Sequence, residues 1–112
     1  MPRPHLGEFE EIVLLTVAVL DEGAYGIAIK DDMEERLERN VSMGAMRTAL
    51  KRLEDKGYLK SKLGEPTAVR GGKRKRYYTV THAGREALQQ VMDVRKRLWQ
   101  AIPYTSLDFR FI

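Results

Sequence analysis

The chain has 112 residues, of which 43% are hydrophobic and 32% charged, and its formal net charge is +4. This length favours one domain with a modest core, and the composition is typical of a folded protein. The absence of cysteine excludes disulfides, thiolate metal sites and cysteine nucleophiles. The longest apolar run, residues 12–20, is far shorter than the roughly 20 residues that span a bilayer. We therefore expect neither a membrane segment nor a signal peptide, and we expect a cytoplasmic protein.

Charge is distributed unevenly along the chain. Residues 1–41 have a net charge of −6, residues 42–76 carry 11 cations and 3 acids for a net charge of +8, and residues 77–112 have a net charge of +2. A basic middle segment behind an acidic first third is expected where one stretch of a chain faces a polyanion. The alternative is a solvated charged surface, but the clustering on consecutive elements favours the polyanion.

Three helices are predicted in the first half of the chain. Residues 8–20 form a helix that is apolar on more than one side, which indicates contacts with its own domain and with a partner subunit. Gly23 is suited to the left-handed position that ends this helix. A second helix over about 25–39 has one apolar stripe and an acidic opposite side. Ser42 is a good N-cap for a third helix over about 43–56, whose exposed side is basic.

Two helices joined by a short turn, the second of them basic, match a helix-turn-helix with the third helix as recognition helix. Residues 58–63 and 76–80 have strand composition and enclose a basic, turn-rich segment. This pattern predicts a hairpin with a long basic tip, and a hairpin in this position is a wing. Thr81 is suited to cap a last helix over about 82–102. The expected fold class is therefore mainly α with a small β-hairpin.

Four short motifs follow one another between residues 25 and 84, within a resemblance to a known family that covers about residues 8–102. They are Tyr25-Gly26-Ile27, then Ser42-Met43-Gly44-Ala45-Met46, then the stretch 50–59 ending in Gly57-Tyr58-Leu59, and then Gly72-Lys73-Arg74-Lys75-Arg76-Tyr77-Tyr78-Thr79-Val80-Thr81 followed by Gly84. Together they resemble the PadR-like family of bacterial transcriptional regulators. The short C-terminal helix is similar to that of the smaller subgroup of this family.

The resemblance implies how the chain is divided and assembled. Residues 1–81 would form a winged helix-turn-helix DNA-binding domain, and residues 82–112 a C-terminal dimerisation helix and tail. In the family this helix usually packs against the first helix of the partner, and the operator has two-fold symmetry. One departure is Arg47, because the family commonly has a tyrosine in the first turn of the recognition helix.

The recognition helix and the wing supply the candidate DNA-binding residues. We expect Gly44 to permit close approach to the major groove and Arg47 to read a guanine edge. Lys51 and Arg52 lie a turn further on and are expected to meet phosphates, while wing cations reach the backbone or an adjacent minor groove. The full set is Ser42, Met43, Gly44, Arg47, Thr48, Lys51, Arg52, Lys73, Arg74, Lys75 and Arg76.

Each of these candidates also has a simpler interpretation. Arg47 could pair with an acid of the second helix, and Lys51 and Arg52 could belong to a solvated face. The wing could be a basic loop that only keeps the protein soluble.

The last helix carries the candidate dimer and effector residues, which are Leu88, Val91, Met92, Arg95, Leu98, Trp99 and Ile102. PadR-like regulators of drug efflux bind flat aromatic compounds between paired tryptophans, which implies a small aromatic effector here. The family's tryptophan position falls on Arg95, with Trp99 one turn later on the same face. The alternative role for Trp99 is packing within the dimer.

No catalytic or cofactor motif is found. Gly71-Gly72-Lys73 lacks the first glycine and the final Ser or Thr of a phosphate-binding loop. His5 and His82 are not in metal-ligand spacing. We expect no enzyme activity, metal or cofactor. The sequence predicts a homodimeric, sequence-specific regulator that binds double-stranded DNA and represses from an inverted-repeat operator. The alternative is a winged-helix module that binds a protein and has lost DNA binding.

Overall fold

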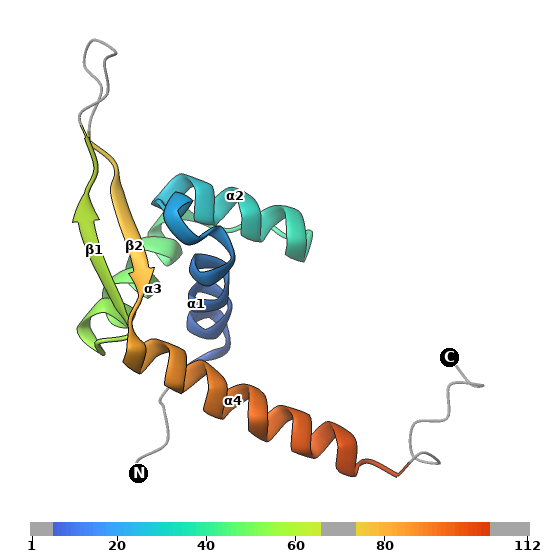
Figure 1. Cartoon of the computed structure of the whole chain (residues 1–112). Coiled ribbons are helices and arrows are strands. Elements are labelled where there is room, and N and C mark those ends of the chain that lie inside the picture. Colours follow the sequence, from blue (N-terminus) through green and yellow to red (C-terminus); the bar gives the residue numbers. More distant parts are fainter. Residues whose placement is uncertain (1–5, 66–73, 104–112) are drawn as a thin grey trace.

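The structure is a computed structural model, and it describes residues 6–65 and 74–103. Within these ranges the chain forms four α-helices, one 3₁₀ turn and one antiparallel hairpin (Figure 1). In chain order they are α1 (Glu8–Leu20), η1 (Asp21–Gly23), α2 (Gly26–Leu37), α3 (Met43–Asp55), β1 (Leu59–Leu63), β2 (Arg76–Val80) and α4 (His82–Ala101). The fold class predicted from the sequence is confirmed, and each predicted element lies within two residues of its observed bounds.

Two of the predicted helix caps are formed. The Ser42 hydroxyl accepts a hydrogen bond from the Ala45 amide at 3.0 Å, and the Thr81 hydroxyl accepts one from the Gly84 amide at 3.0 Å. Each bond satisfies a backbone N–H that the first turn of a helix leaves without an intrahelical partner. These two hydroxyl N-caps therefore fix where α3 and α4 begin.

The prediction for Gly23 was wrong. Asp21, with φ 52°, has the positive φ that follows α1, and the chain continues into η1 instead of turning at a glycine. The carbonyl of Gly23 accepts a hydrogen bond from the Tyr25 amide at 3.1 Å, which leads directly into α2. Among the described glycines only Gly57 has a positive φ, +80°, and it lies just after α3.

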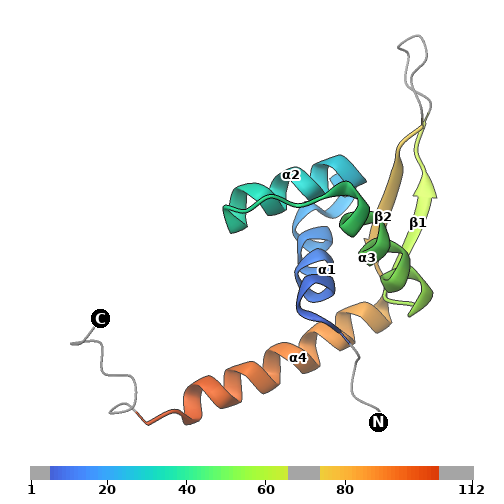
Figure 2. The ribbon, with the colours of Figure 1, turned by 180° about the vertical axis from the view of Figure 1, so that it is seen from behind.

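The core lies between the first three helices and the base of the hairpin. α1 stands between α2 and α4, and the two strands run from the start of α4 past the helices (Figures 1 and 2). The pairing is antiparallel, from Leu59 opposite Val80 to Leu63 opposite Arg76. The buried cluster consists of Val13, Leu14, Val17, Ala24, Ile29, Met33, Val41, Met46, Ala49, Leu50, Leu53, Leu59 and Leu88.

α4 begins in close contact with the entry to the hairpin. Gly84 leaves no room for a side chain, because a Cβ at this position would overlap the backbone carbonyl of Tyr58. The Thr81 amide donates to the same carbonyl at 3.0 Å, and its hydroxyl donates to the Gly57 carbonyl at 2.6 Å. The direction in which α4 leaves the winged domain is therefore set at its first turn.

The second half of α4 has no buried residue. The buried residues of this helix, Gly84, Ala87 and Leu88, all lie in the first two turns. From residue 93 to residue 101 every side chain is exposed, and the helix projects away from the rest of the molecule (Figures 1 and 2). In the described part of the chain, none of the helices is long and apolar enough to cross a membrane.

Candidate nucleic-acid interface

α3 has a buried side and a cationic side. Its buried residues are Met46, Ala49, Leu50 and Leu53, at the i, i+3, i+4, i+7 spacing of one helix face. Because this face is fixed against the core, the opposite side must point outward. Arg47, Thr48, Lys51 and Arg52 are all exposed there. Folding thus presents the predicted recognition residues to solvent together.

The cations of α3 are little neutralised. Within the described residues, Arg47 and Arg52 form no ion pair, and Lys51 makes only an exposed pair with Asp55 at 3.5 Å. Such exposed pairs contribute little energy and are screened by salt. Within the described residues Arg47 does not pair with an acid of α2, where Asp32 and Glu34 instead contact Arg36 and Lys30.

The turn between α2 and α3 is held by one carboxylate. Glu34 accepts hydrogen bonds from the Val41 amide and from Lys30 Nζ, both at 2.9 Å. These two bonds lower the pKa of Glu34 below its ordinary value, the backbone bond having the larger effect. At the other end of α2, a Cβ added to Gly26 would lie 3.7 Å from Met43 Cε, so the first turns of α2 and α3 are neighbours.

The wing cations are divided between different partners. Lys73 lies outside the described residues. Arg74 Nε donates to the Gly64 carbonyl at 2.7 Å, which ties its guanidinium to the neighbouring strand. Arg76 donates to Ser61 Oγ at 3.0 Å. Lys75 Nζ instead lies 4.2 Å from the centre of the Tyr25 ring. The hairpin therefore does not present its cations on one face.

Two further lysines, which the sequence analysis did not single out, lie on the wing. Lys60 and Lys62 are exposed on β1 and pair with Thr79 and Tyr77 of β2. Alternate residues of a strand point to the same face, so both lysines lie on the face that carries Tyr77. The Lys-x-Lys spacing within a predicted strand was the signal that could have identified them.

The matched sequence profile decides the family. The profile of the Transcriptional regulator PadR-like family matches residues 14–90. The chain belongs to the PadR-like family. The resemblance predicted from the sequence is confirmed, and with it the assignment as a non-enzymatic transcription regulator with the winged helix-turn-helix of a DNA-binding family.

Several solved PadR-like structures are similar to this chain. A PadR family transcription regulator from Clostridium difficile R20291 has 33% identity and a TM-score of 0.58, with 80% of this chain and 86% of that chain covered. A PadR-like transcription factor from Bacteroides fragilis has 25% identity and a TM-score of 0.69, with 82% and 84% covered. One from Eggerthella lenta has 24% identity and a TM-score of 0.65, with 83% and 80% covered. No curated protein matches the chain.

In this PadR-like regulator the predicted dimer residues are not equivalent. Leu88 packs in the core of its own chain, and Val91, Met92 and Ile102 are half-buried. Leu98 and Trp99 are 65% and 64% exposed. Among the predicted dimer residues that the structure describes, Leu98 and Trp99 therefore offer the largest apolar surface to another chain.

Arg95 has a partner that the sequence did not indicate. Its Nη2 and Nε lie 2.8 and 3.1 Å from the two carboxylate oxygens of Glu11, whose side chain is almost buried. The hydrogen bonds to this carboxylate raise the pKa of Arg95. Arg95, the basic residue that interrupts the apolar face of α4, thus links α4 to α1 through this ion pair.

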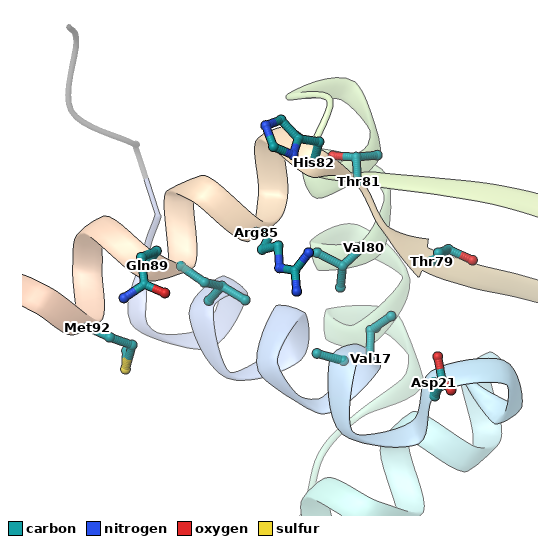
Figure 3. A pocket seen from close by; sticks show the side chains of 11 residues that line it. Val17, Asp21, Thr79, Val80, Thr81, His82, Arg85, Gln89 and Met92 are labelled. Atoms are coloured by element: carbon teal, nitrogen blue, oxygen red, sulfur yellow. The ribbon is translucent and has the colours of Figure 1, made fainter.

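A half-open hollow of about 510 Å³ lies between α1, β2 and α4 of the PadR-like fold. Val17, Val80 and Leu88 belong to its apolar lining, and Arg85 points toward Val80 across it (Figure 3). Trp99 is not part of its lining. Within residues 6–65 and 74–103, no three His, Asp or Glu side chains gather closely enough to hold a metal ion.

Proposed function

We propose that this chain binds double-stranded DNA sequence-specifically as a homodimer and represses transcription by occupying an inverted-repeat operator. The observation that carries the proposal is the exposed cationic side of α3. Arg47 and Arg52 face solvent there without an acidic partner among the described residues. A protein surface that keeps such charges uncompensated is suited to phosphates and base edges. Binding to genomic DNA as a transcriptional regulator also implies a cytoplasmic location.

In this proposal the first turn of α3 enters the major groove. Gly44 supports close approach, because nothing lies within 4 Å of a Cβ built on it. Arg47, one turn further on, then reaches a guanine, where a two-point contact contributes about 1–3 kcal/mol of discrimination. Thr48 contacts a base or a phosphate, and Lys51 and Arg52 contact phosphates.

The exposed half of α4 supports the homodimer. Val94, Leu98 and Trp99 are exposed on α4, and Val19 is 57% exposed on α1. Apolar surface on both helices is what packing of α4 against α1 of a second chain requires. Two-fold symmetry then places two recognition helices about 34 Å apart, one turn of DNA, and requires an operator with inverted half-sites.

A planar aromatic effector is a finer part of the proposal. Within the described residues of one chain no ring stacks on Trp99, so a stacking site needs the tryptophan of the second chain. Titration with planar aromatic cations should quench the tryptophan fluorescence of the dimer if this site exists. Unchanged fluorescence at high ligand concentration removes the effector and leaves Trp99 as a packing residue.

Gel-shift assays against the DNA upstream of the protein's own coding region, over a salt series, test the proposed function. We expect a retarded complex on one fragment, a steep loss of affinity with salt, and a footprint with two-fold symmetry. Failure to bind any DNA at low salt overturns the proposal and favours the protein-binding module. Binding with equal affinity to every fragment contradicts sequence specificity.

A further inference from the structure

Tyr25 joins the wing to the helix-turn-helix. It is the N-cap residue of α2, and it forms an isolated antiparallel bridge with Tyr77 of β2. The hydrogen bond of this bridge runs from the Tyr78 amide to the Ala24 carbonyl, at 2.8 Å. Residues 24 and 25 thus act as a short third strand beside β2.

The side chains reinforce this connection on one face of the hairpin. The rings of Tyr25 and Tyr77 meet edge to face, with centroids 5.6 Å apart. The Tyr77 ring is in turn pressed against Gly64, where a Cβ would be only 2.5 Å from it. The aromatic pair is therefore held from both sides, and its position leaves little freedom to the end of the hairpin where Leu63 pairs with Arg76.

Lys75 is the cation that this aromatic pair holds. Its Nζ lies 4.2 Å from the centre of the Tyr25 ring, within the range of a cation–π contact. The Lys75 carbonyl accepts from the Gly64 amide at 2.7 Å, so its backbone is also fixed. Arg74 and Arg76, by contrast, are tied to Gly64 and Ser61 of the opposite strand.

The place where Lys75 is held lies close to the expected path of DNA. Tyr25 immediately precedes the first turn of α2, and that turn neighbours the first turn of α3 through Gly26 and Met43. In a helix-turn-helix the start of the recognition helix faces the base edges, while the helix before it crosses the phosphate backbone. A cation held beside both helix starts therefore lies at the edge of the groove.

We propose that Tyr25 is a positioning residue for DNA binding, and that its ring holds Lys75 where the ammonium group contacts a backbone phosphate flanking the groove that α3 enters. The inference rests on the proposed DNA binding. It assigns different roles to two parts of the surface: α3 discriminates between DNA sequences, and the Tyr25–Lys75 pair adds affinity for DNA of any sequence. The contact also makes the wing and the recognition helix bind as one unit.

The test measures the affinity of the full chain for a mixed-sequence duplex over a salt series. The variants are Lys75→Met, Tyr25→Leu, Tyr25→Phe and the Tyr25→Leu/Lys75→Met double variant. Lys96→Met is the matched control, because it removes one exposed lysine from α4, far from the wing. Thermal melts establish that each variant is folded before its affinity is compared.

We expect Lys75→Met and Tyr25→Leu each to reduce the slope of log K against log salt by about 0.9, the value for one phosphate contact. The ratio of the DNA affinity of the unsubstituted chain to that of either variant should then fall about 3.5-fold between roughly 50 and 200 mM salt. Tyr25→Phe, which keeps the ring, and Lys96→Met should bind like the unsubstituted chain. The double variant should be no weaker than the weaker single variant, because both substitutions remove the same contact.

Other results overturn the inference. If Lys75→Met binds like the unsubstituted chain, Lys75 contacts no phosphate. If folded Tyr25→Leu keeps the full slope while Lys75→Met loses it, Lys75 acts without Tyr25. Both results leave the proposed function intact, since the unsubstituted chain still binds DNA. A chain that shows no salt-dependent DNA binding at all refutes the proposed function itself.

Discussion

The carboxylate of Glu11 and the guanidinium of Arg95, 84 positions apart in the chain, form a two-point ion pair between α1 and α4. The two partners differ in exposure: the Glu11 side chain is 9% exposed and the Arg95 side chain 60%. The pair lies one turn before Leu98 and Trp99, the most exposed large apolar residues of α4. It therefore fixes the helix at the point where its apolar end leaves the winged domain.

Because the two partners differ in exposure, we expect their substitution to lower the free energy of unfolding by different amounts. Arg95→Met should lower the free energy of unfolding more than Glu11→Gln, because it leaves a nearly buried carboxylate without its partner. Glu11→Gln leaves an arginine that water can solvate. Urea denaturation measures both, with Arg97→Met as a control on the exposed surface of the same helix. Equal losses for the two variants would contradict the unequal burial as their cause.

Substitution of Arg47 should change specificity more than affinity. We expect Arg47→Ala to lose about 1–3 kcal/mol of discrimination at a single operator position, because a guanine contact carries sequence information. Arg52→Ala should weaken binding to all sequences alike, as the loss of a phosphate contact does. Competition assays with operators that differ at one base pair compare the two. A uniform loss for Arg47→Ala would argue against direct readout.

Gly44 should show opposite effects on stability and on DNA binding. Gly44→Ala adds a methyl group in open space within α3, so stability should rise by up to about 0.5–1 kcal/mol. The same methyl group obstructs the groove, so the affinity for DNA should fall. Gly84→Ala is the contrasting control, since its Cβ meets the Tyr58 backbone and should cost about 1–3 kcal/mol. Unchanged DNA affinity of Gly44→Ala would place this turn away from the groove.

Glu34 should make stability depend on pH at the acidic end. Its pKa is lower in the folded state than the ordinary value of 4.5, because the Val41 amide and Lys30 bind the charged form. The resulting stabilisation is fully present above the ordinary value and is lost as the pH falls through the lower folded value. Glu34→Gln should therefore be less stable near neutral pH and lose less stability on acidification.

Urea denaturation near neutral pH and near pH ~3 measures this difference. The control is Glu35→Gln, which alters an exposed acid of the same helix and should leave the pH profile as it is. A Glu34→Gln variant whose stability falls with acid as steeply as that of the unsubstituted chain would show that this carboxylate does not hold the turn.

The exposed end of α4 should control the oligomeric state. Leu98→Glu places a charge in the proposed dimer interface and should raise the dimer Kd about 30-fold or more, the effect of losing a central apolar contact of ~2 kcal/mol. Operator affinity should fall with it. Sedimentation measures the monomer–dimer equilibrium, and Lys96→Glu, an exposed and already polar position on the same helix, is the control. A Leu98→Glu chain that remains dimeric would exclude this end of α4 from the interface.

Much of the fold could be predicted because its signals are local. The apolar spacing of α3, the caps at Ser42 and Thr81 and the strand composition of β1 and β2 each depend on neighbours within one or two turns of chain. The same signals failed at Gly23, because a polar residue, Asp21, took the positive φ before the glycine was reached. The cationic side of α3 also followed from the sequence, since burial of its apolar side leaves only one direction for Arg47.

The sequence by itself determined that the chain has a helix-turn-helix, a wing and a basic recognition helix. Only the tertiary structure decided what the individual wing and C-terminal cations contact. Tyr25 holds Lys75, and Glu11 binds Arg95, because the crossing of β2 past α2 and of α4 past α1 brings them together. Such contacts depend on the packing of whole elements, which no periodicity within one segment encodes.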